Sequence, residues 1–210
     1  MQAQTPRGPR QSGFADRARF LKTLVASPRL TGAVAPSGRA LARAMAAAAG
    51  SPAHGLIVEL GPGTGPVTRA LIATGLPPER LVLVEYDAGF CGLLKQRFPL
   101  ASVVQGDAYD LPRTLAPLAG EPIAAIVSSL PLLNQPPARR AKLIADAFAL
   151  MGPSGLFVQF TYGLKSPVPH GAGGHLYSAV RSRPILLNLP PAFVWAYRLA
   201  RRDSDAAKSR

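Results

Sequence analysis

The sequence has a single cysteine and few carboxylates. Cys91 has no second cysteine to pair with, which excludes an intrachain disulfide, and residues 1–13 lack the apolar segment of a secretory signal. We therefore expect a cytoplasmic protein. The 24 Lys and Arg residues outnumber 11 Asp and Glu residues, which gives a net charge of +13. This excess of base points to a polyanionic partner, either nucleic acid or an anionic membrane face.

Long hydrophobic runs are also missing. The longest stretch of low polarity, 184–196, contains an asparagine and three prolines and is shorter than the ~20 residues of a spanning helix. A chain of this kind that meets a membrane lies on its surface. Its charge is divided, because residues 1–53 carry eight bases and one acid, 54–150 carry eight of each, and 151–210 carry eight bases and two acids.

The two ends of the chain differ from its middle. Residues 1–13 and 203–210 are polar without periodicity, so we expect both to be disordered. Residues 14–26 have the spacing of a short amphipathic helix whose apolar side chains span an arc of roughly 160°. A second helix is expected over 38–49, with Ser37 as its N-cap.

From residue 56 onwards, short β-rich runs alternate with helical stretches. This alternation is typical of an α/β fold in which helices cover both faces of a parallel sheet. Two later apolar runs are expected to add a terminal antiparallel pair. The expected strands cover 56–60, 81–85, 102–105, 123–130, 155–161, 184–187 and 193–199, and the expected helices lie between 65 and 75, over 89–98 and over 138–151.

The strongest motif is the glycine-rich stretch Glu59–Gly65, which reads Glu-Leu-Gly-Pro-Gly-Thr-Gly after the first expected strand. Glycines let the backbone turn sharply and approach a ligand at the carboxyl edge of a parallel sheet. Pro66 stands where a dinucleotide motif needs its third glycine, and the lysine of a phosphate-binding loop is missing. Glu59 would repel a pyrophosphate but pair with an ammonium group. The motif therefore favours S-adenosylmethionine, whose methionine end carries an amine.

Two further acids follow later strands. Glu85 ends the second strand, where a carboxylate can accept both ribose hydroxyls of a nucleoside. Asp107 follows the third strand and could accept from an adenine amino group. Each acid alone could equally be a solvated strand end or a helix cap, but with Glu59 and the glycines they favour a cofactor site. Tyr86 either stacks on the adenine or covers the sheet edge.

The spacing of Glu59–Gly65, Glu85 and Asp107 resembles that of class I S-adenosylmethionine-dependent methyltransferases. The resemblance implies a Rossmann-like, seven-stranded, mostly parallel sheet over residues 54–202, with helices on both faces and the last strand antiparallel. It also implies S-adenosyl-L-methionine as cofactor and S-adenosyl-L-homocysteine as product. The cofactor contacts that it implies are Glu59, Gly61, Gly63, Gly65, Glu85, Tyr86, Asp107, Ala108 and Ser128.

The segment Ser129–Leu132 is where many of these enzymes position the methyl acceptor. The rRNA adenine dimethylases share a glycine stretch like that of this chain, and there this segment reads Asn-Leu-Pro followed by Tyr or Phe. Adenine N6 is a weak nucleophile that needs hydrogen bonds and a ring stacked on its base. Ser129 and Leu132 supply neither. An RNA methyltransferase stays open as an alternative, as does a binding module that has lost activity.

Several motifs in one order extend the resemblance over residues 14–198. They are Gly32–Ser37, Glu59–Gly65, Ser129–Leu132, Gln159–Gly163 and Asn188–Tyr197. Together they resemble the bacterial phospholipid N-methyltransferases, which convert phosphatidylethanolamine towards phosphatidylcholine through mono- and dimethyl intermediates.

The N-terminal helix of that family attaches the enzyme to anionic lipid. The resemblance thus implies a monomeric peripheral enzyme on the inner face of the cell membrane, with lipid rather than nucleic acid as its partner. The second helix would cover the active site within an N-terminal segment 14–53. The implied membrane contacts are Phe14, Arg17, Arg19, Phe20, Leu21, Lys22 and Leu24.

A deprotonated primary amine is already a good nucleophile, so the enzyme needs mainly to align it and remove a proton. Tyr162, at the end of the fifth strand, could hold the amine by its hydroxyl or stabilise the quaternary product by a cation–π contact, or could be a buried tyrosine. Ser129 is the second catalytic candidate. Candidate head-group contacts are Gln159, Tyr177, Asn188 and Arg181.

His170 and His175 lie close together but have no neighbouring cysteine or carboxylate. Two histidines give too few ligands, so we expect no metal. The glycine-rich loop 166–176 is expected instead to cover the mouth of the site and to move as substrate enters.

Overall fold

The computed structural model of the protein describes residues 36–200 except 170, 172–176 and 189. The expected membrane-binding helix over 14–26 lies outside these residues, as do His170, His175 and the tail. No helix among the described residues combines the length and apolarity needed to cross a bilayer.

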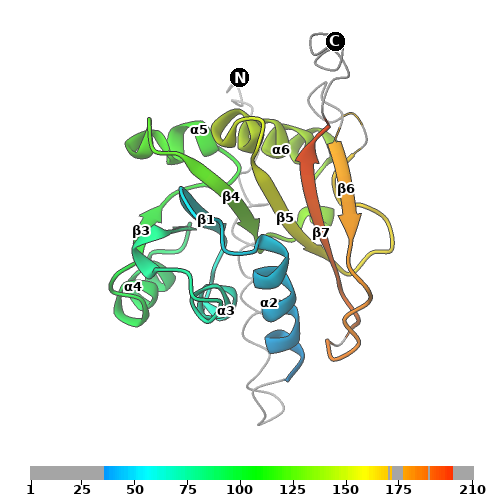
Figure 1. Ribbon diagram of the computed structural model, residues 1–210, viewed down its shortest axis with the longest axis horizontal. Helices are drawn as coiled ribbons and strands as arrows, with labels where there is room; N and C mark the ends of the chain where they lie inside the picture. The colour runs from blue at the N-terminus through cyan, green and yellow to red at the C-terminus, as the bar shows by residue number, and fades with distance from the viewer. Residues whose placement is uncertain (1–35, 170, 172–176, 189, 201–210) are drawn as a thin grey trace, which may run out of the picture. The chain divides into compact units, whose positions relative to one another are not determined.

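Helices and strands alternate along the described chain (Figure 1). The helices are α2 (Pro36–Ala49), α3 (Pro66–Ile72), α4 (Ala88–Arg97), α5 (Leu111–Thr114) and α6 (Pro137–Met151), with 3-10 turns at Pro78–Arg80, Ala116–Leu118 and Leu132–Asn134. The strands are β1 (Leu56–Leu60), β2 (Leu81–Glu85), β3 (Ser102–Gln105), β4 (Ile123–Ser128), β5 (Leu156–Thr161), β6 (Tyr177–Arg181) and β7 (Phe193–Leu199).

The seven strands form one sheet in the order β3-β2-β1-β4-β5-β7-β6. Strands β1 to β5 are parallel, whereas β7 runs antiparallel to both β5 and β6. The mostly parallel, seven-stranded sheet with an antiparallel last strand is therefore confirmed. Because β1 and β2 have a parallel neighbour on each side and helices on both faces, their side chains are nearly all buried and read as continuous apolar runs.

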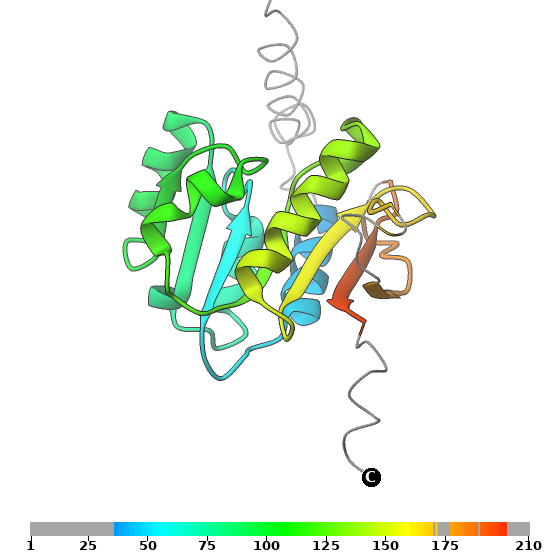
Figure 2. The same ribbon diagram turned by 90° about the horizontal axis from the view of Figure 1, so that it is seen from above.

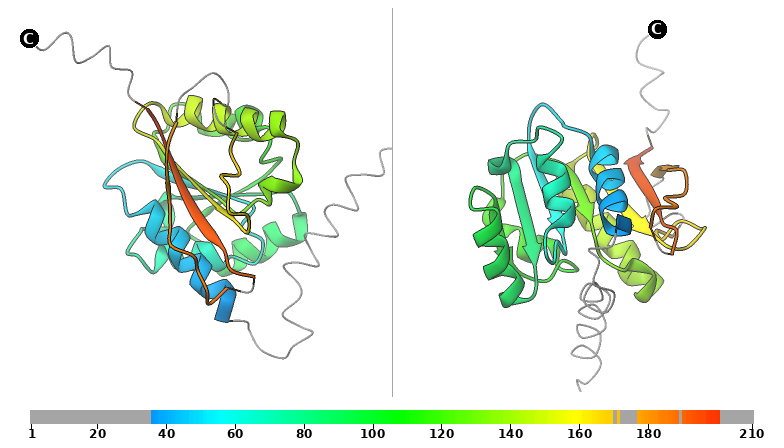
Figure 3. Two further views of the ribbon diagram at one scale, coloured as in Figure 1. Left: turned by 90° about the vertical axis from the view of Figure 1, so that its right-hand side faces the viewer. Right: turned by 90° about the horizontal axis from the view of Figure 1, so that it is seen from below.

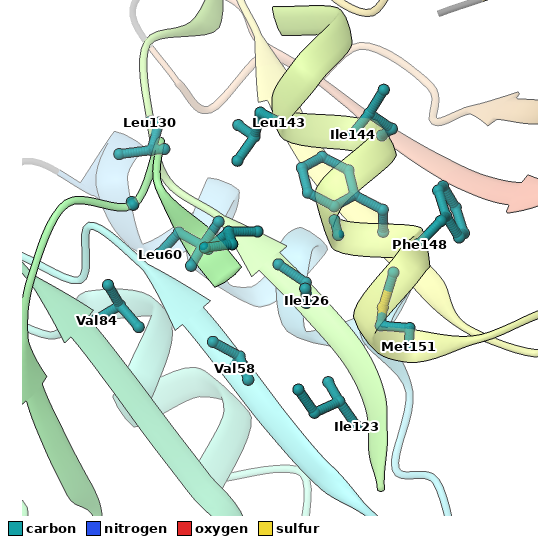
Figure 4. Close-up of a cluster of buried hydrophobic side chains, with 14 of the residues drawn as sticks. Val58, Leu60, Val84, Ile123, Ile126, Leu130, Leu143, Ile144, Phe148 and Met151 are labelled. Atoms are coloured by element: carbon teal, nitrogen blue, oxygen red, sulfur yellow. The ribbon is translucent and has the colours of Figure 1, made fainter. Parts of the chain in front are cut away.

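Helices cover both faces of the sheet (Figures 2 and 3). On one face α5 and α6 pack on alternate strand residues such as Val58 and Ile126. Figure 4 shows Leu143 of α6 on the side of these strands, with Ile144, Phe148 and Met151 of the same cluster along the helix. On the other face α2, α3 and α4 pack on the intervening residues, among them Ile57 and Val127. The α2 helix, expected to belong to the N-terminal segment 14–53, thus contributes to the core of the sheet.

The terminal antiparallel pair differs from its expected residues. The run 184–187 is no strand, since it joins the sheet only through an isolated bridge between Ile185 and Ala192. The partner of β7 is instead β6, four of whose five side chains are exposed. The side chains of an exposed edge strand need not be apolar, so the apolar pattern predicted a strand at 184–187 instead of at 177–181. The expected strand 123–130 also ends two residues early, at Ser128.

Met45 tests whether α2 is part of this core. Its side chain is 1% exposed. Met45→Ala should lower the free energy of unfolding by about 2–5 kcal/mol, because it leaves a cavity between helix and sheet. Arg43→Ala on the exposed face of the same helix should change it by less than about 0.5 kcal/mol. Urea unfolding of both variants measures this difference, and equal effects would contradict the packing of α2.

Candidate functional site

The glycine loop between β1 and α3 is shaped by positive φ angles. Gly61, Gly63 and Gly65 have φ values of 68°, 56° and 83°, a region that side chains disfavour. A Cβ at Gly61 would also lie 2.8 Å from Leu130 Cδ2. The loop is pinned from outside by Arg97, whose Nη1 donates to the Thr64 carbonyl at 2.8 Å. Its backbone is therefore held at the carboxyl end of β1.

Glu85 ties this loop to the neighbouring strand. It is the last residue of β2 and is 8% exposed. Its Oε2 accepts from the Gly63 N–H at 3.1 Å, while its Oε1 accepts from the N–H groups of Tyr86 and Asp87 at 2.9 and 3.0 Å. An ionised carboxylate has about four lone-pair sites, so three bonds leave capacity for a ligand hydroxyl.

Glu59 is fully buried on β1, on the face that α3 covers. Thr68 Oγ1 of α3 donates to its Oε2 at 2.6 Å, and its Oε1 has no hydrogen-bond partner among the described residues. Burial, with a smaller contribution from the charge of Glu85, raises the pKa of Glu59 to about 8. A buried acceptor without a partner is costly, and an ammonium group is a ligand that would satisfy it. Thr68 was not expected, because nothing in the sequence pairs residues nine apart here.

Asp107 lies at the carboxyl end of β3 and is already paired on both oxygens. Its Oδ1 accepts from the Tyr109 N–H at 2.8 Å, and its Oδ2 lies 3.5 Å from Arg139 Nη2. The Arg139 guanidinium also stands 4.2 Å from the centre of the Tyr109 ring. Sequence reasoning missed Arg139, since it enters from α6, 32 positions later. Any adenine contact by Asp107 would share the carboxylate with this guanidinium.

The end of β4 lies against the start of the glycine loop. Ser129 N–H donates to the Leu60 carbonyl at 2.9 Å, and Ser129 Oγ is buried without a partner among the described residues. Ser128 is fully buried and accepts from the Leu130 N–H at 3.4 Å. Gln159 Nε2 donates to the carbonyls of Leu130 and Phe160 at 2.8 and 2.7 Å. Gln159 is 0% exposed, so it braces this segment rather than facing solvent.

Two tyrosines stand open at the same edge. Tyr86 is 58% exposed and Tyr162 is 48% exposed. The Tyr162 ring packs edge-on against Phe160, with 5.5 Å between ring centres. Tyr162 is therefore not the buried tyrosine that was one reading of the sequence. Leu132, by contrast, is 2% exposed and belongs to the core, so it displays nothing to a ligand.

The remaining predicted contacts are less directly placed. Ala108 has its side chain in the core, which leaves only its backbone for a ligand. Tyr177 stacks on Phe148 and pairs with Leu199, at the sheet edge opposite the glycine loop. Asn188 is 5% exposed and donates to the Pro190 carbonyl within its own turn. Arg181 lies over the rings of Phe193 and Trp195.

The site thus consists of Glu59, the glycine loop, Glu85 and Ser129 around the carboxyl ends of β1, β2 and β4. Within the described part of the chain, buried oxygens of Glu59 and Ser129 have no partner. Together with the free capacity on Glu85, they suit a ligand rich in hydrogen-bond donors, with an ammonium and a neighbouring hydroxyl. Among the described residues, no group of three or more His, Cys, Asp or Glu side chains is arranged to hold a metal.

The raised pKa of Glu59 makes a testable prediction about stability. The carboxyl is protonated in the folded protein up to about pH 8 but ionises at about 4.5 when unfolded. The stability that this carboxyl contributes to the folded protein is therefore fully present below pH 4.5 and is lost as the pH rises through 8. Glu59→Gln cannot ionise, so the stability of the natural protein should fall relative to this variant between pH 5 and 8. Urea unfolding at both pH values measures this, and a pH-independent difference would contradict the buried carboxyl.

No family model matches the chain. Over 109 residues it is 35% identical to the ornithine lipid N-methyltransferase of Singulisphaera acidiphila, covering 50% of this chain and 57% of that protein. Over 85 residues it is 45% identical to ribosomal RNA small subunit methyltransferase A of Burkholderia ambifaria, covering 38% of this chain and 31% of that protein. The chain therefore spans little more than half of the first relative and about a third of the second.

Solved structures share the architecture. The TehB-like S-adenosylmethionine-dependent methyltransferase of Corynebacterium glutamicum superimposes with a TM-score of 0.54 over 89% of this chain and 97% of that one, at 17% identity. TrmN of Thermus thermophilus gives 0.58 over 76% of this chain and 48% of that one, at 19% identity. The chain has the Rossmann-like class I fold of the S-adenosylmethionine-dependent methyltransferases.

Proposed function

We propose that this protein methylates the amine of a membrane lipid with S-adenosylmethionine as methyl donor, and that the lipid is phosphatidylethanolamine. The cofactor supplies an electrophilic methyl group when bound. Glu59 would hold its ammonium and Glu85 a ribose hydroxyl, and the glycine loop would lie against the part of the cofactor between these two groups. Glu59 Oε1 has no hydrogen-bond partner among the described residues. This supports the assignment, because an ammonium would supply the missing hydrogen-bond donor.

The residues at the expected place of the methyl acceptor, after β4, favour a lipid amine. The segment after β4, residues 129–134, contains no aromatic residue, and its Leu132 is buried, so it presents no ring for an adenine base to stack on. An aliphatic amine needs no such ring, because its nitrogen is nucleophilic once deprotonated. The relative from Singulisphaera acidiphila, named for ornithine lipid, supports a lipid acceptor.

The basic side chains near the carboxyl ends of β5 and β6 fit a lipid head group that bears a phosphate. Residues 147–200 contain no Asp or Glu, whereas Lys165, Arg181 and Arg183 all lie at or after the end of β5 or β6. Guanidinium and ammonium groups pair well with phosphate. Methylation of RNA is the second candidate, because the same bases suit a nucleic-acid backbone and the relative from Burkholderia ambifaria is named for ribosomal RNA.

Labelled S-adenosylmethionine tests the proposal when it is offered with phosphatidylethanolamine vesicles, ornithine-lipid vesicles, RNA and phosphatidylcholine vesicles as the control without a free amine. We expect label in phosphatidylethanolamine and none in phosphatidylcholine. Label confined to ornithine lipid would overturn the choice of lipid but keep lipid methylation. Label confined to RNA, or absent throughout, would overturn the proposed function.

Tyr162 allows a sharper test of how the amine is held. Among the described residues its hydroxyl has no hydrogen-bond partner, and its ring is braced by Phe160. We therefore expect Tyr162→Phe to keep kcat/KM within about twofold. Tyr162→Ala should lower kcat/KM by about fivefold, as expected for a partly exposed cation–π contact. Equal losses in both variants would instead assign the role to the hydroxyl.

A further inference from the structure

The connection between β6 and β7 exposes apolar side chains that the fold does not use. Leu186 and Leu187 are 74% and 75% exposed, in the run 184–187 that resembles a buried strand in sequence. Leu164, in the loop after β5, is 72% exposed. Single exposed leucines are common on soluble proteins, but several at one edge indicate a contact surface.

The turn that carries Leu186 and Leu187 is held in place. Ile185 N–H donates to the Ala192 carbonyl at 2.8 Å, and Asn188 N–H donates to the Ile185 carbonyl at 3.1 Å. Asn188 Nδ2 donates to the Pro190 carbonyl at 2.8 Å, and the Ile185 side chain packs on the core that α2 covers. These contacts fix the turn while its two leucines point into solvent.

Neighbouring loops join this turn at the carboxyl edge of the sheet. Arg181 Nη1, at the end of β6, donates to the Leu164 carbonyl at 2.9 Å. A Cβ at Gly163 would lie 3.1 Å from Leu133 of the segment after β4, and Leu133 is 51% exposed. Thr161, the last residue of β5, pairs with Phe193, the first of β7. Figure 1 shows the β6–β7 connection at the same end of the strands as the start of α2.

The charged residues nearest to these leucines in the sequence are all basic. Lys165 and Arg183 are exposed beside them, and no acid occurs anywhere in residues 147–200. Aliphatic side chains flanked by bases match an anionic bilayer, in which leucines enter the interface and bases meet phosphates. None of these leucines offers the aromatic face on which a nucleic-acid base stacks, although Tyr162 next to Leu164 is exposed.

We propose that Leu133, Leu164, Leu186 and Leu187, with Lys165 and Arg183, form a membrane-docking surface that seats on anionic phospholipid. Leu164 follows Tyr162 by two positions, and Gly163 between them lies against Leu133, so docking would bring lipid head groups to Tyr162 without the lipid leaving the bilayer. This use of the surface rests on the proposed function, whereas docking itself does not. It does not include residues 14–26.

Vesicle flotation of the full chain tests the docking surface. Leu186→Ser combined with Leu187→Ser should weaken binding to phosphatidylethanolamine–phosphatidylglycerol vesicles at least about tenfold, because two large apolar side chains no longer enter the interface. The matched control is Leu100→Ser, which removes a leucine that is 60% exposed at the far edge of the sheet, between α4 and β3. That control should bind as the natural protein does.

Circular dichroism and calorimetry with S-adenosylmethionine should give the same melting temperature and cofactor affinity for both variants. Unchanged vesicle binding by the double variant, or an equal loss in the Leu100 control, would overturn the docking surface. A loss of RNA binding in the double variant with vesicle binding intact would also overturn it. Weakened docking by the double variant while the natural protein labels no lipid would support the surface and overturn only the proposed function.

Discussion

The bond between Glu85 Oε2 and the Gly63 N–H organises the functional end of this protein. It joins the last residue of β2 to the turn after β1, and the other oxygen of the same carboxylate fixes the start of the segment that leads to α4. The bond is possible only because parallel strands end at one edge, and because glycines give the turn its positive φ angles. A substituted loop would lose both its shape and its approach to a ligand.

Burial and ligand binding are also linked at Glu59 and Thr68, which are buried more deeply than Glu85. Glu59 is held by Thr68 on one oxygen only, in surroundings that favour its neutral form. The unpaired oxygen weakens the ligand-free protein, and an ammonium would both pair with it and favour ionisation. A cost to stability and a preference for one class of ligand therefore have the same physical cause. Functional sites commonly contain such compromises.

The two halves of the sheet differ in chemistry. The acids around the glycine loop lie on β1, on β2 and after β3, whereas residues 147–200, which contain β5 to β7, carry bases alone. The antiparallel addition of β7 and β6 also brings the connection between them to the carboxyl edge. An acidic side around the glycine loop and a basic, partly apolar side thus meet along one line of strand ends.

The cofactor side of the site was predictable from sequence, because strands buried on both faces read as apolar runs and the order of parallel strands places Glu59, the glycines and Glu85 at one edge. The ends of β1 and β2 agree with their expected residues for that reason, and those of β3, a half-buried edge strand, agree as well. The acceptor side was not predictable. Pairing with β7 decided that 177–181 is a strand and that 184–187 is an exposed turn, and packing decided that Leu132 and Gln159 are buried while Tyr162 is open. The sequence by itself thus determined the positions of the residues that follow from local spacing. The tertiary structure decided which of the other residues are buried or exposed, because their exposure depends on partners far along the chain.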